Sequence, residues 1–244
     1  METHFGFRRS PDWEDPSVLQ VNREAPHVLW GAFHNAEAAR TSRRMTGPLA
    51  LDLDGTWAFR LVPSPAVAEP FWEEEFNDRD WSGIRVPGSW EMQGFGEPAY
   101  TNTFYPWRND ADEHHMIRPH ILEPDRDVRP DPPRIPSDNP TGCYRRTFRM
   151  PEAWRDMDVF LAFDGVETAF RCWVNGTPAG YAQDSKLPSE FQITSLVRAG
   201  DNRLAVQVFR YAASSYLEDQ DYWHLCGIHR SVRVFARPKR RIVD

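Results

Sequence analysis

The stretch "VFLAFDGVETAFRCWVNG", residues 159–176, decides the fold class, because it carries two short strands and a turn signal. Val159–Phe163 is a continuous apolar run closed by Asp164-Gly165, and Ala169–Val174 is rich in aromatic and β-branched residues. Asn175-Gly176 follows, and this dipeptide is among the strongest sequence signals for a tight β-hairpin turn. The stretch therefore predicts a hairpin after residue 174 and a fold built from short strands.

Strand patterns also lie on both sides of this stretch. Leucines alternate with other residues over 49–53, Asp54–Gly55 predicts a hairpin turn, and large apolar residues alternate again over 57–61. Residues 204–208 carry a clean period-2 stripe, and 232–235 is expected to be the last strand. About eight short strands with no long helix predict an all-β fold, a β-sandwich of jelly-roll type.

Two segments do not follow this pattern. Residues 1–45 are polar and Pro-containing, which predicts an extended N-terminal arm, with a short helix over Asn35–Arg40 that Asn35 would cap. Residues 46–244 form the predicted jelly-roll domain. Within them, residues 107–138 are rich in proline and charge and are expected to be a long loop insert.

Composition excludes several classes of partner. A net charge of −7 argues against nucleic acid or an anionic membrane, and no stretch approaches the roughly 20 apolar residues of a membrane span. The three cysteines stand at unrelated spacings, which favours free thiols in a reducing compartment, and the N-terminus carries no long apolar run. A cytoplasmic location is therefore expected. Ten tryptophans and 15 phenylalanines suit a sandwich core, or a surface that stacks on sugar rings.

The segment "SSYLEDQDYWHLCGIH", residues 214–229, gathers acids, histidines and a cysteine. His224, Cys226 and His229 do not have a zinc-site spacing. Asp219 and Asp221 on one strand would point the same way, so they could not flank a glycosidic bond as a catalytic pair. A polar or cation-binding wall stays open, since hard cations bind carboxylate oxygens.

The segment "YTNTFYP", residues 100–106, places Asn102 among aromatic residues. Its amide has both a donor and an acceptor, which suits the hydroxyls of a sugar. The alternative is a turn asparagine that bonds its own backbone. The residues of this segment leave both interpretations open.

Seven blocks, in order along nearly the whole chain, resemble the N-terminal domain of the large β-galactosidases of glycoside hydrolase family 2. They are "DWEDPSVLQVNREAPH" (12–27), "VPGSWEMQGFGEPAYTNTFYP" (86–106), "NPTGCYRRTF" (139–148), "FDGVETAFRCWVNG" (163–176), "GYAQDSKLPSEF" (180–191), "AGDNRLAVQVFR" (199–210) and "SYLEDQDYW" (215–223). The insert at 107–138 departs from the family by its length.

The resemblance implies a galactose-binding-like jelly roll that is followed by an immunoglobulin-like domain and a (β/α)8 barrel. In that family both catalytic glutamates lie in the barrel, so no catalytic residue is expected in this chain and the isolated chain is predicted to be inactive. The full-length enzyme would be a retaining β-galactosidase that hydrolyses terminal β-D-galactosides and forms a homo-oligomer. The arm resembles a segment that the family uses at subunit contacts.

The resemblance also implies a role for two residues. Asn102 matches an asparagine that binds galactose hydroxyls, and Asp221 matches an aspartate that contacts the sugar and helps to hold a sodium ion. Magnesium is expected in the full-length enzyme. Two other interpretations are a free-standing carbohydrate-binding module and a structural or oligomerisation domain without activity of its own.

Overall fold

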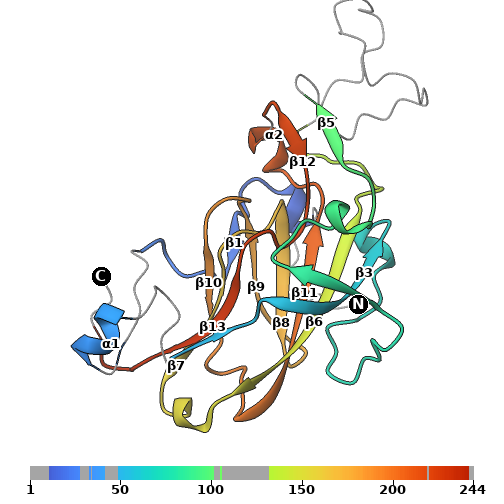
Figure 1. Cartoon of the computed structure of the whole chain (residues 1–244). Helices are drawn as coiled ribbons and strands as arrows, with labels where there is room; N and C mark the ends of the chain where they lie inside the picture. Colours follow the sequence, from blue (N-terminus) through green and yellow to red (C-terminus); the bar gives the residue numbers. More distant parts are fainter. Residues whose placement is uncertain are drawn as a thin grey trace, which may run out of the picture.

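Two antiparallel sheets stacked face to face make up most of the molecule, as the computed structural model shows (Figure 1). The structure describes residues 11–27, 33, 35–41, 49–101, 105, 132–218 and 220–241. Over these residues the larger sheet has the strand order β1-β9-β8-β11-β6-β3-β4, and the smaller one has the order β10-β7-β13-β2. A separate two-stranded ribbon, β12-β5, stands at one end beside α2 (Figure 1). The prediction of an all-β sandwich is confirmed.

The described strands are β1 (Gln20–Val21), β2 (Ala50–Asp52), β3 (Gly55–Val62), β4 (Ser82–Val86), β5 (Ala99–Thr101), β6 (Thr141–Met150), β7 (Asp158–Phe163), β8 (Ala169–Val174), β9 (Thr177–Gln183), β10 (Ser189–Gln192), β11 (Gly200–Phe209), β12 (Tyr222–His224) and β13 (Val232–Arg237). The short helices are α1 (Ala36–Thr41), α2 (Ser215–Glu218) and the 3-10 turns η1 (Asp12–Glu14), η2 (Pro65–Val67), η3 (Glu91–Gln93) and η5 (Glu152–Trp154).

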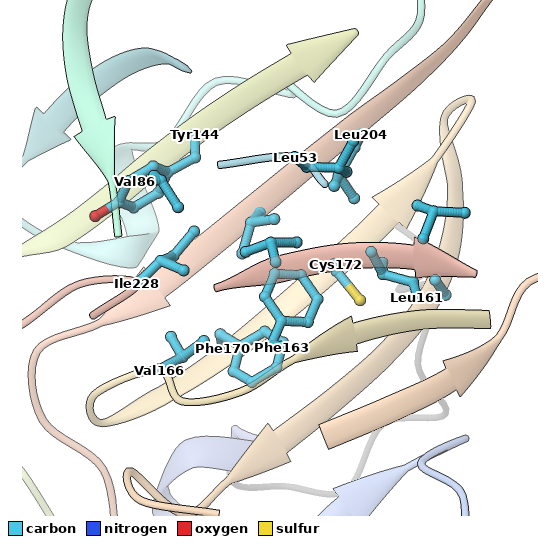
Figure 2. Packing of buried hydrophobic residues seen from close by; sticks show 14 of the residues in the cluster. Leu53, Val86, Tyr144, Leu161, Phe163, Val166, Phe170, Cys172, Leu204 and Ile228 are labelled. Atoms are coloured by element: carbon cyan, nitrogen blue, oxygen red, sulfur yellow. The ribbon is translucent and has the colours of Figure 1, made fainter. Parts of the chain in front are cut away.

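The main hydrophobic core lies between the two sheets, as Figure 2 shows for part of it. Phe170, Cys172 and Leu204 enter it from the larger sheet, and Leu161 and Phe163 enter it from β7 of the smaller one. Because side chains alternate along each strand, each sheet contributes the side chains of its inner face to this core.

The hairpin predicted at Asn175-Gly176 is confirmed. Val174 of β8 pairs with Thr177 of β9, so the two residues between them make the whole loop. Asn175 has a φ of 49° and Gly176 a φ of 77°, the left-handed values that a two-residue type I′ turn requires.

The hairpin predicted at Asp54–Gly55 is wrong. The strands on either side lie in different sheets, since β2 pairs with β13 whereas β3 pairs with β4 and β6. The Asp54 carboxylate accepts hydrogen bonds from Ser231 Oγ at 2.8 Å and from the Val232 N–H at 3.0 Å. These bonds attach the bend between β2 and β3 to the start of β13. Gly55, with a φ of 126°, lets the chain cross from one sheet to the other at this bend.

The described part of the N-terminal arm packs on the domain itself. β1 pairs with β9 at the edge of the larger sheet. The Trp13 ring stacks on Phe209 with centroids 4.5 Å apart, and the Arg171 guanidinium lies 5.0 Å from the Trp13 ring. Farther along, the predicted helix is confirmed as α1, where the Ala38 N–H donates to Asn35 Oδ1 at 2.8 Å.

A loop over residues 65–81 covers part of the outer face of the larger sheet. Its aromatic side chains pack with Trp173 and Cys143 in a second apolar cluster. Arg145 of β6 is buried beneath the loop, where its Nε donates to Asp78 Oδ2 at 2.8 Å and its guanidinium also donates to the carbonyl oxygens of Phe71 and Glu73.

The three cysteines, Cys143, Cys172 and Cys226, are free, as predicted, and all three are buried. Burial raises the pKa of the Cys143 thiol to about 12, and it raises the pKa values of the other two thiols as well. Within the described ranges, no helix combines the length and the apolar character that a membrane crossing would need.

Candidate functional site

The two-stranded ribbon at the end of the sandwich carries the acid that the sequence singles out. β5 and β12 pair antiparallel, with Thr101 opposite Tyr222, Tyr100 opposite Trp223 and Ala99 opposite His224. Directly opposed residues of an antiparallel pair share one face, and successive residues take opposite faces. The ribbon therefore has an outer face with Tyr100 and Trp223 and an inner face with Tyr222 and His224.

The outer face presents two aromatic rings beside a carboxylate. Tyr100 and Trp223 are 46% and 56% exposed, and their ring centroids lie 5.6 Å apart at an angle of 45°. The Tyr100 hydroxyl donates a 2.6 Å hydrogen bond to Asp221 Oδ1. This bond, with burial and the charge of Asp221 as smaller causes, raises the pKa of Tyr100.

Asp221 itself is exposed, and one of its oxygens is bound to Tyr100. Its second oxygen, Oδ2, makes no hydrogen bond within the described part of the chain. A carboxylate oxygen accepts hydrogen bonds from sugar hydroxyls and is also a ligand for hard cations. Asp221 therefore fits one position in a cation's coordination shell, although no three His, Cys, Asp or Glu side chains among the described residues gather as a metal site.

Asn102 lies outside the described residues. The residue before it, Thr101, ends β5 and pairs with Tyr222, the residue after Asp221. The two candidate residues thus adjoin the same end of one ribbon in sequence. Asp219 and residues 107–131 of the predicted insert also lie outside the described part.

The inner face of the ribbon contacts a polar group. The Tyr222 hydroxyl lies 3.4 Å from Glu167 Oε1 and 3.3 Å from the Glu218 carbonyl oxygen. Lys186 Nζ lies 2.5 Å from Glu167 Oε2 and 5.4 Å from the centroid of the Tyr222 ring. Burial raises the pKa values of Glu167 and Tyr222, and burial lowers the pKa of His224.

A buried ion pair, Glu91 and Arg210, binds the backbone next to both strands of the ribbon, β12 and β5. Glu91, whose side chain is fully buried, accepts the Cys226 N–H at 2.9 Å, just after β12. The Arg210 guanidinium lies 3.9 Å from the Glu91 carboxylate and donates to the Glu97 carbonyl at 3.0 Å, just before β5. Burial raises the pKa of Glu91 despite this cation. The ribbon is therefore anchored at two points on the sandwich.

The histidines and the cysteine of residues 214–229 have separate surroundings. His224 lies on the inner face against Tyr222, Cys226 is buried with its N–H on Glu91, and His229 follows in the next loop. Glu218 ends α2, and its carboxylate binds Ser185. Of the acids in this segment that the structure describes, Asp221 is the one on the outer face of the ribbon.

Sequence patterns did not reveal the partners of Asp221. Its partner Tyr100 is 121 positions away, and Glu167 and Lys186, which contact Tyr222 of the same ribbon, come from other loops. The one available signal was the three aromatic residues in "AYTN" and "DYW", which lie within two positions of the two candidate polar residues.

Comparison with known proteins identifies one matching family. A family described as glycosyl hydrolases family 2, sugar binding domain, matches residues 51–123 and 113–238. The two matched ranges together cover more than half of the chain and include both strands of the ribbon.

Solved structures with the same fold include three glycosidases. A Bacteroides uniformis β-glucuronidase has a TM-score of 0.54 at 20% identity over 78% of this chain and 18% of its own. A β-glycosidase from Bacteroides vulgatus scores 0.51 at 19% identity over 77% of this chain and 20% of its own. A Bifidobacterium dentium β-glucuronidase scores 0.51 at 17% identity over 78% of this chain and 30% of its own. At these identities the likeness concerns the fold alone, and the chain spans less than a third of each protein.

Proposed function

Because the chain belongs to the sugar-binding domain family of the family 2 glycosyl hydrolases, we propose that it is the sugar-binding domain of a retaining β-galactosidase. In this proposal Asn102 and Asp221 contact the galactose of a terminal β-D-galactoside. The two catalytic glutamates belong to a barrel domain outside this chain, so the chain alone hydrolyses nothing.

The observation that supports the proposal is the position of Asp221 on the exposed face of the ribbon. Its Oδ1 accepts the Tyr100 hydroxyl at 2.6 Å, which fixes the direction of the carboxylate. Its Oδ2 is then oriented for a hydroxyl of a sugar held against the ribbon. A fixed acceptor of this kind contributes orientation, since it holds the sugar while carboxylates elsewhere do the chemistry.

Asp221 also favours a neutral sugar over an acidic one. A galactoside donates hydroxyl protons to the carboxylate, whereas the carboxylate of a glucuronide would meet a like charge at this position. The β-glucuronidases among the related structures make β-glucuronides the alternative substrate class. Where sodium is bound, Asp221 would be one of its ligands and the ion would add a contact for the sugar. Magnesium belongs to the same proposal as a cofactor of the full-length enzyme.

The proposal is tested in the full-length enzyme with nitrophenyl β-D-galactoside and the matching glucuronide. We expect Asp221→Asn to raise KM for the galactoside about 10- to 100-fold, because a hydrogen bond to a charged group contributes roughly 1.5–3 kcal/mol. The effect on kcat should be smaller if the contact is made in the ground state as well. A glucuronide hydrolysed faster than the galactoside would overturn the substrate assignment and leave the family intact.

The chain alone provides the second measurement. A purified chain that releases nitrophenol, with the release abolished by a substitution within residues 11–241, would contradict the placement of the catalytic groups outside it. Titration calorimetry of the chain with millimolar galactose separates the proposal from a free-standing carbohydrate-binding module, which would give measurable heat without the barrel. A structural or oligomerisation domain would give neither heat nor a change in KM for Asp221→Asn.

A further inference from the structure

The loop between β9 and β10 is bound to the segment that carries Asp221. The Glu218 carboxylate, at the end of α2, accepts the Ser185 N–H at 2.9 Å and the Ser185 hydroxyl at 2.6 Å. Both oxygens are used, so the carboxylate is fixed in place and direction. Glu218 stands three residues before Asp221, and the loop therefore holds the chain on the N-terminal side of Asp221.

The loop that receives Glu218 has a strained backbone. Asp184 has a φ of 126°, a value that non-glycine residues rarely adopt. Its Oδ1 accepts the N–H groups of Lys186 and Leu187, each at 3.2 Å, and the Arg23 guanidinium lies 3.9 Å from its carboxylate. Strain of this kind persists only where the surroundings over-determine it, and it is concentrated at functional sites.

The chain on the C-terminal side of Asp221 is held through Tyr222, the first residue of β12. The Tyr222 hydroxyl lies between Glu167 Oε1 and the Glu218 carbonyl oxygen, at 3.4 and 3.3 Å. Glu167 is fixed in turn, because Lys186 Nζ contacts its Oε2 at 2.5 Å and its backbone exchanges hydrogen bonds of 3.0 and 3.1 Å with Gly227. Tyr222 is thus linked, through Glu167 and Lys186, to the loop whose Ser185 binds Glu218.

These contacts form one network that reaches the chain before and after Asp221. Glu218, three residues before Asp221, is tied to the sandwich through Ser185. Tyr222, the residue after Asp221, is tied to it through Glu167 and Lys186. Burial raises the pKa of Glu167, so keeping this carboxylate charged has an energetic cost that apolar packing would avoid. This cost is explained if the network serves to fix the position of Asp221, because a polar network with its hydrogen bonds made holds its members rigidly.

We propose that Glu218 and Tyr222 are positioning residues that fix the Asp221 carboxylate for the sugar; this inference rests on the proposed function. They do not touch the sugar. They act through Asp221. Their contacts hold the chain before and after it, and Tyr100 binds the carboxylate itself.

The test is a double-mutant cycle in the full-length enzyme. We expect Glu218→Ala to raise KM for nitrophenyl β-D-galactoside about 5- to 30-fold, with a smaller change in kcat. In the Asp221→Asn background the same substitution should change KM less than twofold, because its target has already been removed. Glu218→Gln should restore most of the affinity, since its amide oxygen can still accept the Ser185 N–H while its amide NH2 donates to Ser185 Oγ.

Two controls separate positioning from general stability. Glu152→Ala removes another carboxylate, one that pairs with Arg155 on the surface, and should leave KM unchanged. Ser185→Ala deletes one hydroxyl and should raise KM in the same direction as Glu218→Ala, which keeps the test available if Glu218→Ala fails to fold. Hydrogen exchange of the amides over residues 219–224 in the chain alone should be at least fivefold faster in Ser185→Ala.

The outcomes distinguish the inference from the function on which it rests. If Asp221→Asn leaves KM unchanged, the proposed sugar contact is wrong. If Asp221→Asn raises KM but Glu218→Ala and Ser185→Ala do not, or if their effects multiply independently with that of Asp221→Asn, the positioning network is wrong and the sugar contact stands. Unchanged exchange over residues 219–224 also contradicts the network, whatever the substrate.

Discussion

His229 lies half-buried next to two cations, and these surroundings favour its neutral imidazole. Burial, followed by the charges of Lys186 and Arg230, lowers the pKa of His229 from 6.5 to about 4. In the unfolded chain the same imidazole binds a proton near its ordinary pKa. Between pH 6.5 and 4 the unfolded chain therefore holds more protons than the folded one, and the stability contributed by His229 falls as the pH falls.

This linkage gives a prediction for urea unfolding at pH 7 and pH 5. We expect the native chain to lose on the order of 1 kcal/mol more than His229→Asn between the two conditions, a figure reduced for partial exposure. Glu91 and Glu167 have raised pKa values and act with the opposite sign, so the difference between the two proteins is the quantity to compare. Equal losses would mean that His229 is solvated like a free imidazole.

At the residue scale, the sequence was more informative about candidates than about their partners. The motif around Asp221 identified it as a candidate, and the structure places it on the exposed face of the ribbon with Tyr100. Nothing local in the sequence pairs Tyr100 with a residue 121 positions away, or turns Glu218 toward Ser185. Such contacts depend on how distant loops meet, which periodicity does not encode.

The loop over residues 65–81 illustrates how one buried cation can hold an irregular element. Arg145 is 3% exposed, and its guanidinium contacts Asp78 and the backbone carbonyls of the loop. The Phe76 ring lies 5.4 Å from the same guanidinium. The planar guanidinium of an arginine spreads its donors over three nitrogens and reaches acceptors at separate positions, which the compact ammonium of a lysine cannot span.

We therefore expect Arg145→Lys to lower the free energy of unfolding by about 2–4 kcal/mol, because it leaves buried acceptors without a donor. Urea titration followed by far-UV circular dichroism measures the loss. Arg149→Lys on the same strand is the matched control, since Arg149 is 78% exposed and pairs with Asp201 on the surface. A loss below 1 kcal/mol for Arg145→Lys would show that the aromatic packing alone holds the loop.

At the element scale, two similar dipeptides had different outcomes. Asn175-Gly176 forms the predicted hairpin because both residues adopt positive φ and the flanking strands pair with each other. Asp54–Gly55 has the same turn chemistry, but the Asp54 carboxylate is bound to β13 and the chain enters the other sheet. Turn residues specify a local bend, whereas the choice of strand partner follows from packing across the core.

On the scale of the whole molecule, the N-terminal arm contributes to the sandwich that it precedes. β1 covers the edge of the larger sheet at β9, and Trp13, Val18 and Val21 pack on a small apolar cluster of that sheet. The Asp12 carboxylate lies 2.8 Å from the Arg171 guanidinium, largely buried. The resemblance implies a role in subunit contacts, and these bonds add a role within the fold.

Deleting residues 1–27 should therefore lower the free energy of unfolding by more than about 3 kcal/mol, because it removes β1 and the apolar contacts of a tryptophan and two valines that are partly buried. Deleting residues 1–10 leaves these contacts in place and is the control. Urea titration of the two truncated chains gives the comparison. Truncated chains of equal stability would assign the arm to assembly only.

The burial of all three thiols has a practical consequence. An alkylating reagent needs a thiolate at the surface, and Cys143, Cys172 and Cys226 are buried with raised pKa values. A single cysteine introduced at Leu217, which is 87% exposed on α2, would then be the preferred site for a maleimide fluorophore. The wild-type thiols need not be removed first, so the dye would report motions of α2, beside the ribbon, in a protein altered at that one position.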